Sequence, residues 1–202
     1  MRRLNKLGYV VVPGAIPDRL RTELTMGVSS ISGVGTRRLL DNPIVSDTAE
    51  ALRRGPLRTL LQNFVAVQCT GFFKTASDNW AVRRHRDRVV VVKSAIGWEG
   101  VGEKEGLNCA RPPLEHMAQL LAVRLHLDSA HEGDLEVIPG SHRVDSNADS
   151  GPTLVSVPQC GALVMRPLLL HGSKKLQVST KRRVLHYLFA PGNLGVQWYY
   201  AA

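Results

Sequence analysis

The chain has few cysteines and no long apolar run. Its three cysteines, Cys69, Cys109 and Cys160, are scattered and lack the spacing of metal ligands, so we expect free thiols in a reducing compartment rather than disulfides. No apolar stretch approaches the length needed to cross a bilayer, and the first 20 residues lack the apolar segment of a secretion signal. These absences predict a cytoplasmic protein with no membrane partner.

Acidic residues are also scarce, since 17 Asp and Glu residues face 26 Lys and Arg residues and leave a formal net charge of +9. Such a charge is common in proteins that bind nucleic acid, but the chain has no zinc-finger spacing, basic zipper or aromatic RNA-binding signature. In the densest basic group, strand alternation separates His85 and Asp87 from the residues of a solvated opposite face: Arg84, Arg86 and Arg88. We therefore expect no nucleic-acid partner, and an anionic substrate remains a reason for the charge.

The length and composition predict a single globular domain over residues 1–202. A hydrophobic content of 44% with 21% charged residues is ordinary for a folded protein of this size. From residue 65 onward, short β-branched runs alternate with Gly, Pro and polar turns, which is typical of a sandwich or jelly roll. Strands are expected at Val89–Val92, Val123–Leu127, Leu135–Val137, Thr153–Val157, Ala162–Met165 and Val184–Phe189. The prediction is a mainly β protein whose core spans residues 65–202.

Residues 1–64 are expected to flank this core with helices. One helical segment is predicted over residues 17–26, after Pro and Asp at its start, and a second over residues 57–64. Between them, Asp47 and Glu50 form an acidic variant of the capping box, which would start a helix directly after it.

Metal chemistry is suggested by His85 and Asp87, two residues apart, and by His171 far downstream. Two imidazoles and one carboxylate hold one face of an octahedral metal and leave three positions open, as in non-haem Fe(II) oxygenases. Arg182, eleven residues after His171, supplies a fixed cation for the far carboxylate of an oxoacid. Each residue alone is more often an ordinary surface, core or turn residue, so the prediction rests on the joint pattern.

Two long strings carry a resemblance to a known family. They are LAVRLHLDSAHEGDLEVIPGSHR, from Leu121, and CGALVMRPLLLHGSKKLQVSTKRRVLHYLFA, from Cys160. Together with the opening GYVVVPGAIP, they resemble bacterial members of the phytanoyl-CoA dioxygenase family over nearly the whole chain. The resemblance implies a double-stranded β-helix, the cupin-like jelly roll, which carries Fe(II) and uses 2-oxoglutarate as cosubstrate.

The family's functional residues have counterparts at five positions of this chain. The resemblance implies that His85, Asp87 and His171 bind the Fe(II). It also implies that Arg182 and Ser173 bind the far carboxylate of 2-oxoglutarate.

The implied reaction is hydroxylation of a C–H bond of a small molecule by O2, coupled to decarboxylation of 2-oxoglutarate to succinate and CO2. Asp87 favours hydroxylation, because related halogenases replace this carboxylate with a small residue, while desaturation and ring closure stay open. One position departs from the family, which commonly carries glutamine where this chain has Arg86 between the two proximal ligands. We expect the Arg86 side chain to point away from the metal.

Further residues are candidates for substrate binding. Arg124, His126 and Asp128 share one face of a predicted strand. Arg124 is either an inward cation for an acidic group or part of a buried ion pair, and His126 either lines the barrel or bonds to Asp128. Trp98 follows the metal-binding segment and is a candidate wall of a substrate pocket, although aromatic residues so placed are more often core.

Two longer segments are predicted to be lid loops. Gly97–Pro113 is rich in glycine and charge, and Ser141–Pro152 is rich in Ser, Asp and Asn. Arg183 is expected to be exposed, because it follows Arg182, whose side chain is expected to face inward. His131 is expected on the surface, and the sequence leaves the place of His186 open.

Two readings without oxygenase chemistry compete with this prediction. The first is a metal-binding jelly roll without oxygenase turnover, because cupin-like barrels host many functions. The second is an interaction module on a degenerate oxygenase fold, suggested by the basic charge and by Arg86. An oxoacid clamp has no purpose in the first, and metal-independent, salt-dependent binding to nucleic acid would favour the second.

Overall fold

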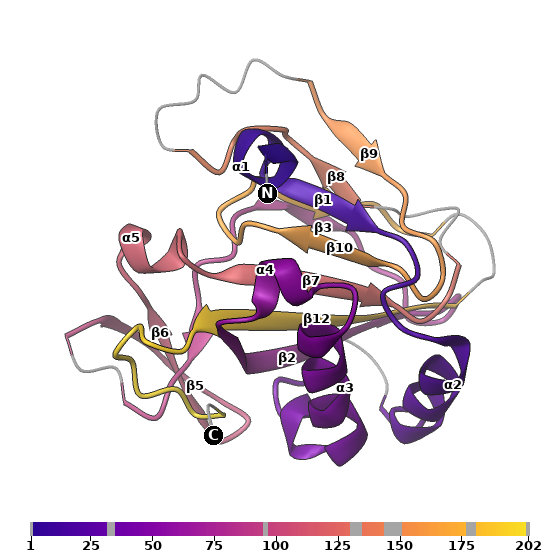
Figure 1. The fold of residues 1–202 in the computed structure, drawn as a ribbon, viewed down its shortest axis with the longest axis horizontal. Helices are drawn as coiled ribbons and strands as arrows, with labels where there is room; N and C mark the ends of the chain where they lie inside the picture. Colours follow the sequence, from indigo (N-terminus) through magenta and orange to yellow (C-terminus); the bar gives the residue numbers. More distant parts are fainter. Residues whose placement is uncertain are drawn as a thin grey trace.

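The computed structural model describes residues 2–31, 35–94, 97–129, 135–143, 151–176 and 181–200. Its strands form a five-stranded, a four-stranded and a three-stranded sheet (Figure 1). The named strands all pair antiparallel with their neighbours. One apolar cluster joins residues of all three sheets, so they share a core.

The five-stranded sheet joins strands that are far apart in the chain. Its order is β1 (Tyr9–Val12), β10 (Ala162–Met165), β7 (Leu121–His126), β12 (Arg182–Pro191) and β2 (Phe64–Lys74). Because β1 pairs with β10, the first 64 residues contribute a strand to the core as well as helices. This crossed order of antiparallel strands, together with the structural comparisons given below, confirms the predicted mainly β, jelly-roll fold.

The four-stranded sheet completes the barrel, and the three-stranded sheet lies at one end of it. The four-stranded sheet has the order β3 (Val82–His85), β11 (His171–Ser173), β8 (Leu135–Val137) and β9 (Thr153–Val155). The three-stranded sheet has the order β4 (Val90–Val91), β6 (Leu107–Arg111) and β5 (Glu99–Lys104). The C-terminal segment reaches the three-stranded sheet, because Trp198 forms an isolated β-bridge with Val92, the residue after β4.

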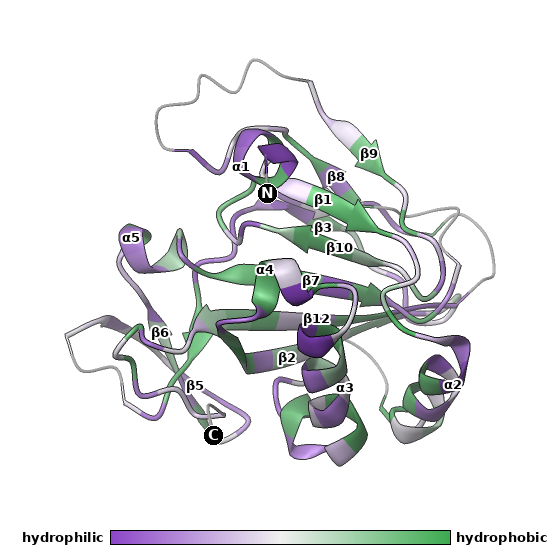
Figure 2. Cartoon of the chain, viewed as in Figure 1, coloured by the Kyte–Doolittle hydropathy of each residue, from purple (hydrophilic) through white to green (hydrophobic). Residues whose placement is uncertain are grey.

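The N-terminal helices cover the outer face of the five-stranded sheet (Figure 1). These helices are α1 (Arg2–Leu7), α2 (Asp18–Gly27), α3 (Pro43–Arg54) and α4 (Arg58–Leu61), with a 3-10 turn at Leu39–Asp41. The short helix α5 (Leu114–Met117) lies between β6 and β7, and its Met117 packs into the other apolar cluster. In Figure 2, α2 and α3 show both hydrophilic and hydrophobic segments, as expected of helices with one face on a sheet. The predicted helix at residues 17–26 is confirmed by α2.

Strand alternation divides the five-stranded sheet into two chemically different faces. On β12, Leu185, Tyr187 and Phe189 pack toward the helices. Leu188 and Ala190 instead pack against the cluster shared with the four-stranded sheet. Toward the other end of β12, the residues on this inner face become polar and charged, which is where the barrel opens into a cavity.

Two helix boundaries differ from the sequence prediction. The helix start predicted after Asp47 and Glu50 is wrong, because both residues lie inside α3. Asn42 caps α3 instead, and its Oδ1 accepts a hydrogen bond from the Ile44 N–H at 3.2 Å. The helix predicted over residues 57–64 is also too long, because Phe64 begins β2 and pairs with Pro191.

The prediction that residues 97–113 form a loop is wrong. Within residues 97–113, β5 and β6 form an antiparallel hairpin that turns at Glu105 and Gly106, both with positive φ. Gly106 adopts this conformation without strain, and the surrounding charge and glycine masked the strand pattern. In the second predicted loop, residues 144–150 lie outside the described residues, as does His131.

No helix in the described ranges is both long enough and apolar enough to cross a bilayer.

Candidate metal and oxoacid site

The structure brings His85, Asp87 and His171 together. β3 and β11 pair so that His85 lies opposite His171, with ring centroids 4.4 Å apart. Asp87 follows β3, and its N–H donates a hydrogen bond to the Pro167 carbonyl at 2.9 Å. One ligand atom from each of the three side chains lies within 4.8 Å of the other two. Residues distant in sequence thus form one group that can hold a metal ion, and we call these three residues the metal group.

Hydrogen bonds set both histidines for metal binding. The Nδ1 atoms of His85 and His171 lie 2.9 and 2.8 Å from the carbonyls of Arg83 and Leu169. A carbonyl only accepts, so each Nδ1 carries the proton, and each Nε2 can present a lone pair to a metal. Asp87 adds a buried Oδ2 with no hydrogen-bond partner among the described residues. This donor set fits Fe(II) and leaves coordination positions open.

Asp87 is ionised in this setting. Burial by itself would raise the pKa of Asp87, but the neighbouring histidines, His171 first, outweigh burial and hold the pKa below its usual range. Burial lowers the pKa of His171, which favours the neutral imidazole that binds metals.

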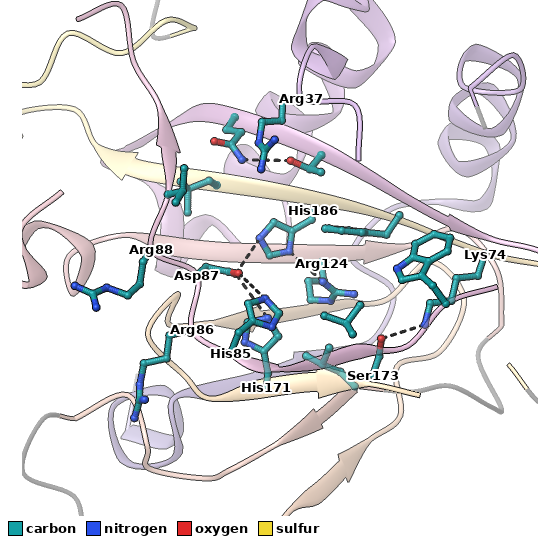
Figure 3. Close-up of a pocket in the computed structure, with 18 of the residues that line it drawn as sticks. Arg37, Lys74, His85, Arg86, Asp87, Arg88, Arg124, His171, Ser173 and His186 are labelled. Carbon is teal, nitrogen blue, oxygen red and sulfur yellow. Dashed lines mark hydrogen bonds and ion pairs between the residues drawn. The ribbon is translucent and has the colours of Figure 1, made fainter. Parts of the chain in front are cut away.

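His186 is a third histidine at this group, which the sequence had left open. Its Nε2 lies 3.5 Å from Asp87 Oδ2, and its Nδ1 lies 3.2 Å from Arg124 Nη1 (Figure 3). A guanidinium only donates, so His186 Nδ1 accepts and the ring proton sits on Nε2, facing Asp87. Burial lowers the pKa of His186 to about 3, so the ring stays neutral. With Nε2 protonated, His186 faces the carboxylate and offers no lone pair to a metal on that side.

These residues line a cavity of 290 Å³ between the sheets. One wall carries alternate residues of β2 and β12: Lys74 pairs with Arg182, Thr70 with His186, and Gln68 with Leu188, and Phe72 of β2 lies between them. We call the end at Lys74 and Arg182 the clamp end, and the opposite end the Gln68 end. The metal group faces the wall between them, at His186.

Three polar groups meet at the clamp end. Lys74 Nζ donates hydrogen bonds to Ser173 Oγ at 3.1 Å and to the Lys174 carbonyl at 2.7 Å. Lys74 and Arg182 are 1% and 3% exposed, so two cations are buried side by side. Burial, then the charges of Arg182 and Arg124, lowers the pKa of Lys74 to about 7. A buried anion would relieve this repulsion.

Lys74 was missed by the sequence analysis. The available signal was the alternation of Gln68, Thr70 and Lys74 within an otherwise apolar strand. Only the pairing with β12 shows that this polar face meets Arg182.

Arg124 points into the same cavity. Its guanidinium lies 5.4 Å from the Phe72 ring centroid, and Nη1 donates to His186 rather than to a carboxylate. Burial, then Arg182, lowers the pKa of Arg124 to about 10. The structure thus favours the inward cation over the buried ion pair.

The predicted alternative for His126, a bond to Asp128, is wrong. Arg183 takes that carboxylate instead, through its N–H at 2.8 Å and its guanidinium at 2.9 and 2.6 Å. Arg183 is therefore a half-buried ion-pair partner and not the exposed residue that was predicted. His126 is buried, and burial, then Arg124, lowers its pKa to about 3. It is not among the residues that line the cavity.

Trp80 and Trp98 occupy different places in the structure. Trp80 lines the cavity, 5.4 Å from Lys74 Nζ. Trp98, which directly precedes β5, does not line it. Trp98 packs on Trp198 and His116, with centroid distances of 6.2 and 5.5 Å, so the structure gives no support to its predicted substrate contact.

Arg86 extends away from His85 and His171, as expected (Figure 3). Its Nε donates to the Leu168 carbonyl at 3.0 Å and its Nη2 to the Ser141 carbonyl at 3.0 Å. Arg86 thus ties the segment that carries His85 and Asp87 to two neighbouring loops. It is not a freely solvated residue.

No family model matches the chain, and no curated protein matches it. The resemblance to the phytanoyl-CoA dioxygenase family is therefore not confirmed by these comparisons.

Solved structures do resemble it. HygX from Streptomyces hygroscopicus, with nickel and 2-oxoglutarate bound, is 12% identical with a TM-score of 0.68, over 96% of this chain and 87% of that one. SnoN, a non-heme alpha ketoglutarate dependent epimerase from nogalamycin biosynthesis, is 14% identical with a TM-score of 0.61, over 93% and 79%. AviO1 from Streptomyces viridochromogenes Tue57 is 20% identical with a TM-score of 0.58, over 95% and 93%. The chain thus has the fold of 2-oxoglutarate-dependent non-haem iron enzymes.

Proposed function

We propose that this protein is an Fe(II)- and 2-oxoglutarate-dependent oxygenase that hydroxylates a C–H bond of a small molecule. The observation that carries the proposal is the presence of a metal-binding group and a buried cationic clamp in one cavity. The solved structures of HygX contain iron, or nickel with 2-oxoglutarate, on the same fold.

His85, Asp87 and His171 would hold the Fe(II) through the two Nε2 atoms and a carboxylate oxygen. Three protein ligands leave room for a bidentate oxoacid and for O2. When bound, the iron and 2-oxoglutarate supply the oxidising chemistry, in which one oxygen atom enters succinate and the other enters the substrate.

The clamp end would bind the far carboxylate of 2-oxoglutarate. Arg182 and Lys74 supply buried positive charge, and the Ser173 hydroxyl can donate a further hydrogen bond. Lys74 Nζ already donates to Ser173 Oγ, which leaves the serine proton available for an anion. The charge of a bound carboxylate would offset the repulsion between the two cations.

The remaining polar residues would position the reaction rather than take part in it. His186 keeps Asp87 oriented through its Nε2–H, and Arg124 fixes the tautomer of His186. Phe72 and Trp80 wall the cavity between the clamp and the metal group. Such walls exclude water from the reacting atoms.

Hydroxylation is one of several outcomes that the fold supports, since SnoN is described as an epimerase. We place hydroxylation first because Asp87 keeps the carboxylate in the ligand set. The clamp also argues against metal binding without turnover, since a metal site alone has no use for two buried cations beside it.

The proposal is tested by turnover of 2-oxoglutarate in 18O2 without added substrate. The expected result is slow, Fe(II)-dependent formation of succinate that carries one 18O atom, together with CO2. Asp87→Ala should abolish it, whereas Arg183→Gln, which changes the ion pair with Asp128 outside the cavity, should retain it. Absence of labelled succinate from folded, iron-loaded protein would refute oxygenase function and support the metal-binding reading.

A further inference from the structure

The Gln68 end of the cavity has its own chemistry. Gln68 pairs with Leu188 here, and Arg38 forms a bridge with the neighbouring Cys69. The residues that line the cavity also include Val89, Met117 and two arginines, Arg37 and Arg88, which Figure 3 shows away from Lys74 and Ser173. Gln68 lies six residues from Lys74 along β2, which is roughly 20 Å of extended strand. The arginines at this end are thus separate from the clamp that we assign to 2-oxoglutarate.

The backbone around Arg37 is fixed. The Arg37 N–H donates to Glu105 Oε2 at 2.8 Å, and Thr36 Oγ1 donates to the same oxygen at 3.0 Å. Gly35 N–H donates to the Gly71 carbonyl at 2.9 Å, and Arg38 forms a parallel bridge with Cys69 of β2. These contacts hold the segment against β2 and leave the Arg37 side chain to extend toward His186 and the cavity (Figure 3).

The guanidinium of Arg37 has no acidic partner within the described part of the chain. Glu105 binds the backbone of this segment, and the ion pairs of the described residues do not include Arg37. The acid that lines the cavity, Asp87, belongs to the metal group. The other polar side chain nearby is already engaged, since Gln68 accepts from Val91 N–H and donates to Thr70 Oγ1.

We propose that the substrate is a small organic acid whose oxyanion binds Arg37. Its carbon skeleton lies on Met117 and Leu188, which places a C–H bond toward the metal group, while Arg88 at the exposed rim attracts the anion. The cavity of 290 Å³ has to hold the cosubstrate as well, and sites for drug-sized ligands measure roughly 300–1,000 Å³. The substrate is therefore small or inserts only one end. This inference rests on the proposed function.

The test uses four probes that share a six-carbon chain: hexanoate, hexyl phosphate, hexan-1-ol and hexylammonium. Each is titrated calorimetrically into protein saturated with Ni(II) and 2-oxoglutarate, so that the clamp end is already filled. We expect one or both acids to bind at least tenfold more tightly than the alcohol and the amine. The comparison of carboxylate with phosphate identifies the preferred oxyanion.

Variants assign the binding to one residue. Arg37→Gln should weaken binding of the preferred acid by about tenfold to a hundredfold, as expected for loss of a charge-assisted hydrogen bond. Arg37→Lys should recover part of the affinity. Arg58→Gln, which removes an equal charge from an exposed position on α4, should leave the affinity unchanged.

Two results would overturn the inference: acids that bind no better than hexan-1-ol, or acid binding that Arg37→Gln leaves intact. Failure of Ni(II) and 2-oxoglutarate to bind would instead refute the proposed function. In that case the same four probes are titrated into metal-free Arg182→Gln protein, whose clamp end is weakened, and acid binding that Arg37→Gln leaves intact there would refute the substrate assignment separately.

Discussion

Replacement of Lys74 by methionine should remove a pH-dependent penalty on folding. Lys74 is 1% exposed, and its pKa in the folded protein is lowered from 10.5 to about 7 by burial and by Arg182 and Arg124. Between those two pH values the unfolded chain binds one more proton than the folded chain at this position. The free energy of unfolding therefore rises with pH, by about 1.4 kcal/mol per unit from this group. The total is on the order of 5 kcal/mol, all of it a penalty below pH 7.

The assay is urea unfolding of metal-free protein between pH 6.5 and 9.5. Burial also raises the pKa values of the Cys69 thiol and the Tyr187 hydroxyl, but these groups are present in both proteins and change stability equally in both. The difference in stability between wild type and Lys74→Met therefore reports on the lysine. Lys74→Met should be the more stable protein at pH 7, with the gap closing toward pH 9.5. Lys175→Met, at an exposed position, serves as the control. A gap that does not depend on pH would refute the burial of a strained cation at the clamp end.

The remaining predictions concern the cosubstrate and the surroundings of the metal group. Affinity for 2-oxoglutarate, measured by calorimetry, should fall up to tenfold per pH unit above pH 7 in wild type but not in Lys74→Met, because the bound anion favours the charged lysine. His186→Leu should weaken Fe(II) binding by roughly 10- to 100-fold in a metal titration, and His186→Gln should restore part of it, since an amide can also donate to Asp87 and accept from Arg124. Arg86→Ala should lower the free energy of unfolding by about 1–3 kcal/mol through loss of two charge-assisted hydrogen bonds, with Fe(II) affinity nearly unchanged.

The sequence predicted the features that depend on local pattern. Alternating β-branched runs predicted most strands. The two-residue spacing of His85 and Asp87 predicted that both belong to the metal group. The capping box at Asp47 failed because Asn42, followed by proline, offers a stronger helix start.

The features that the sequence could not predict depend on strand register. Lys74 and His186 enter the site only through the pairing of β2 and β12. Arg183 follows Arg182 on the other face of β12. There it forms an ion pair with Asp128, a residue just beyond β7. Arg37 lies in a segment with no regular pattern, and the contacts with Glu105 that position it span 68 residues.

We expect the cavity to hold a metal ion and an oxoacid in contact with each other. The most direct measurement is an anaerobic titration of apo-protein with Fe(II) and then 2-oxoglutarate, followed by visible absorption. We expect a charge-transfer band that appears only with both ligands and requires a much higher 2-oxoglutarate concentration in Arg182→Gln, but not in Arg183→Gln. Folded, iron-loaded protein that shows no band at saturating 2-oxoglutarate would contradict a shared site for the metal and the oxoacid.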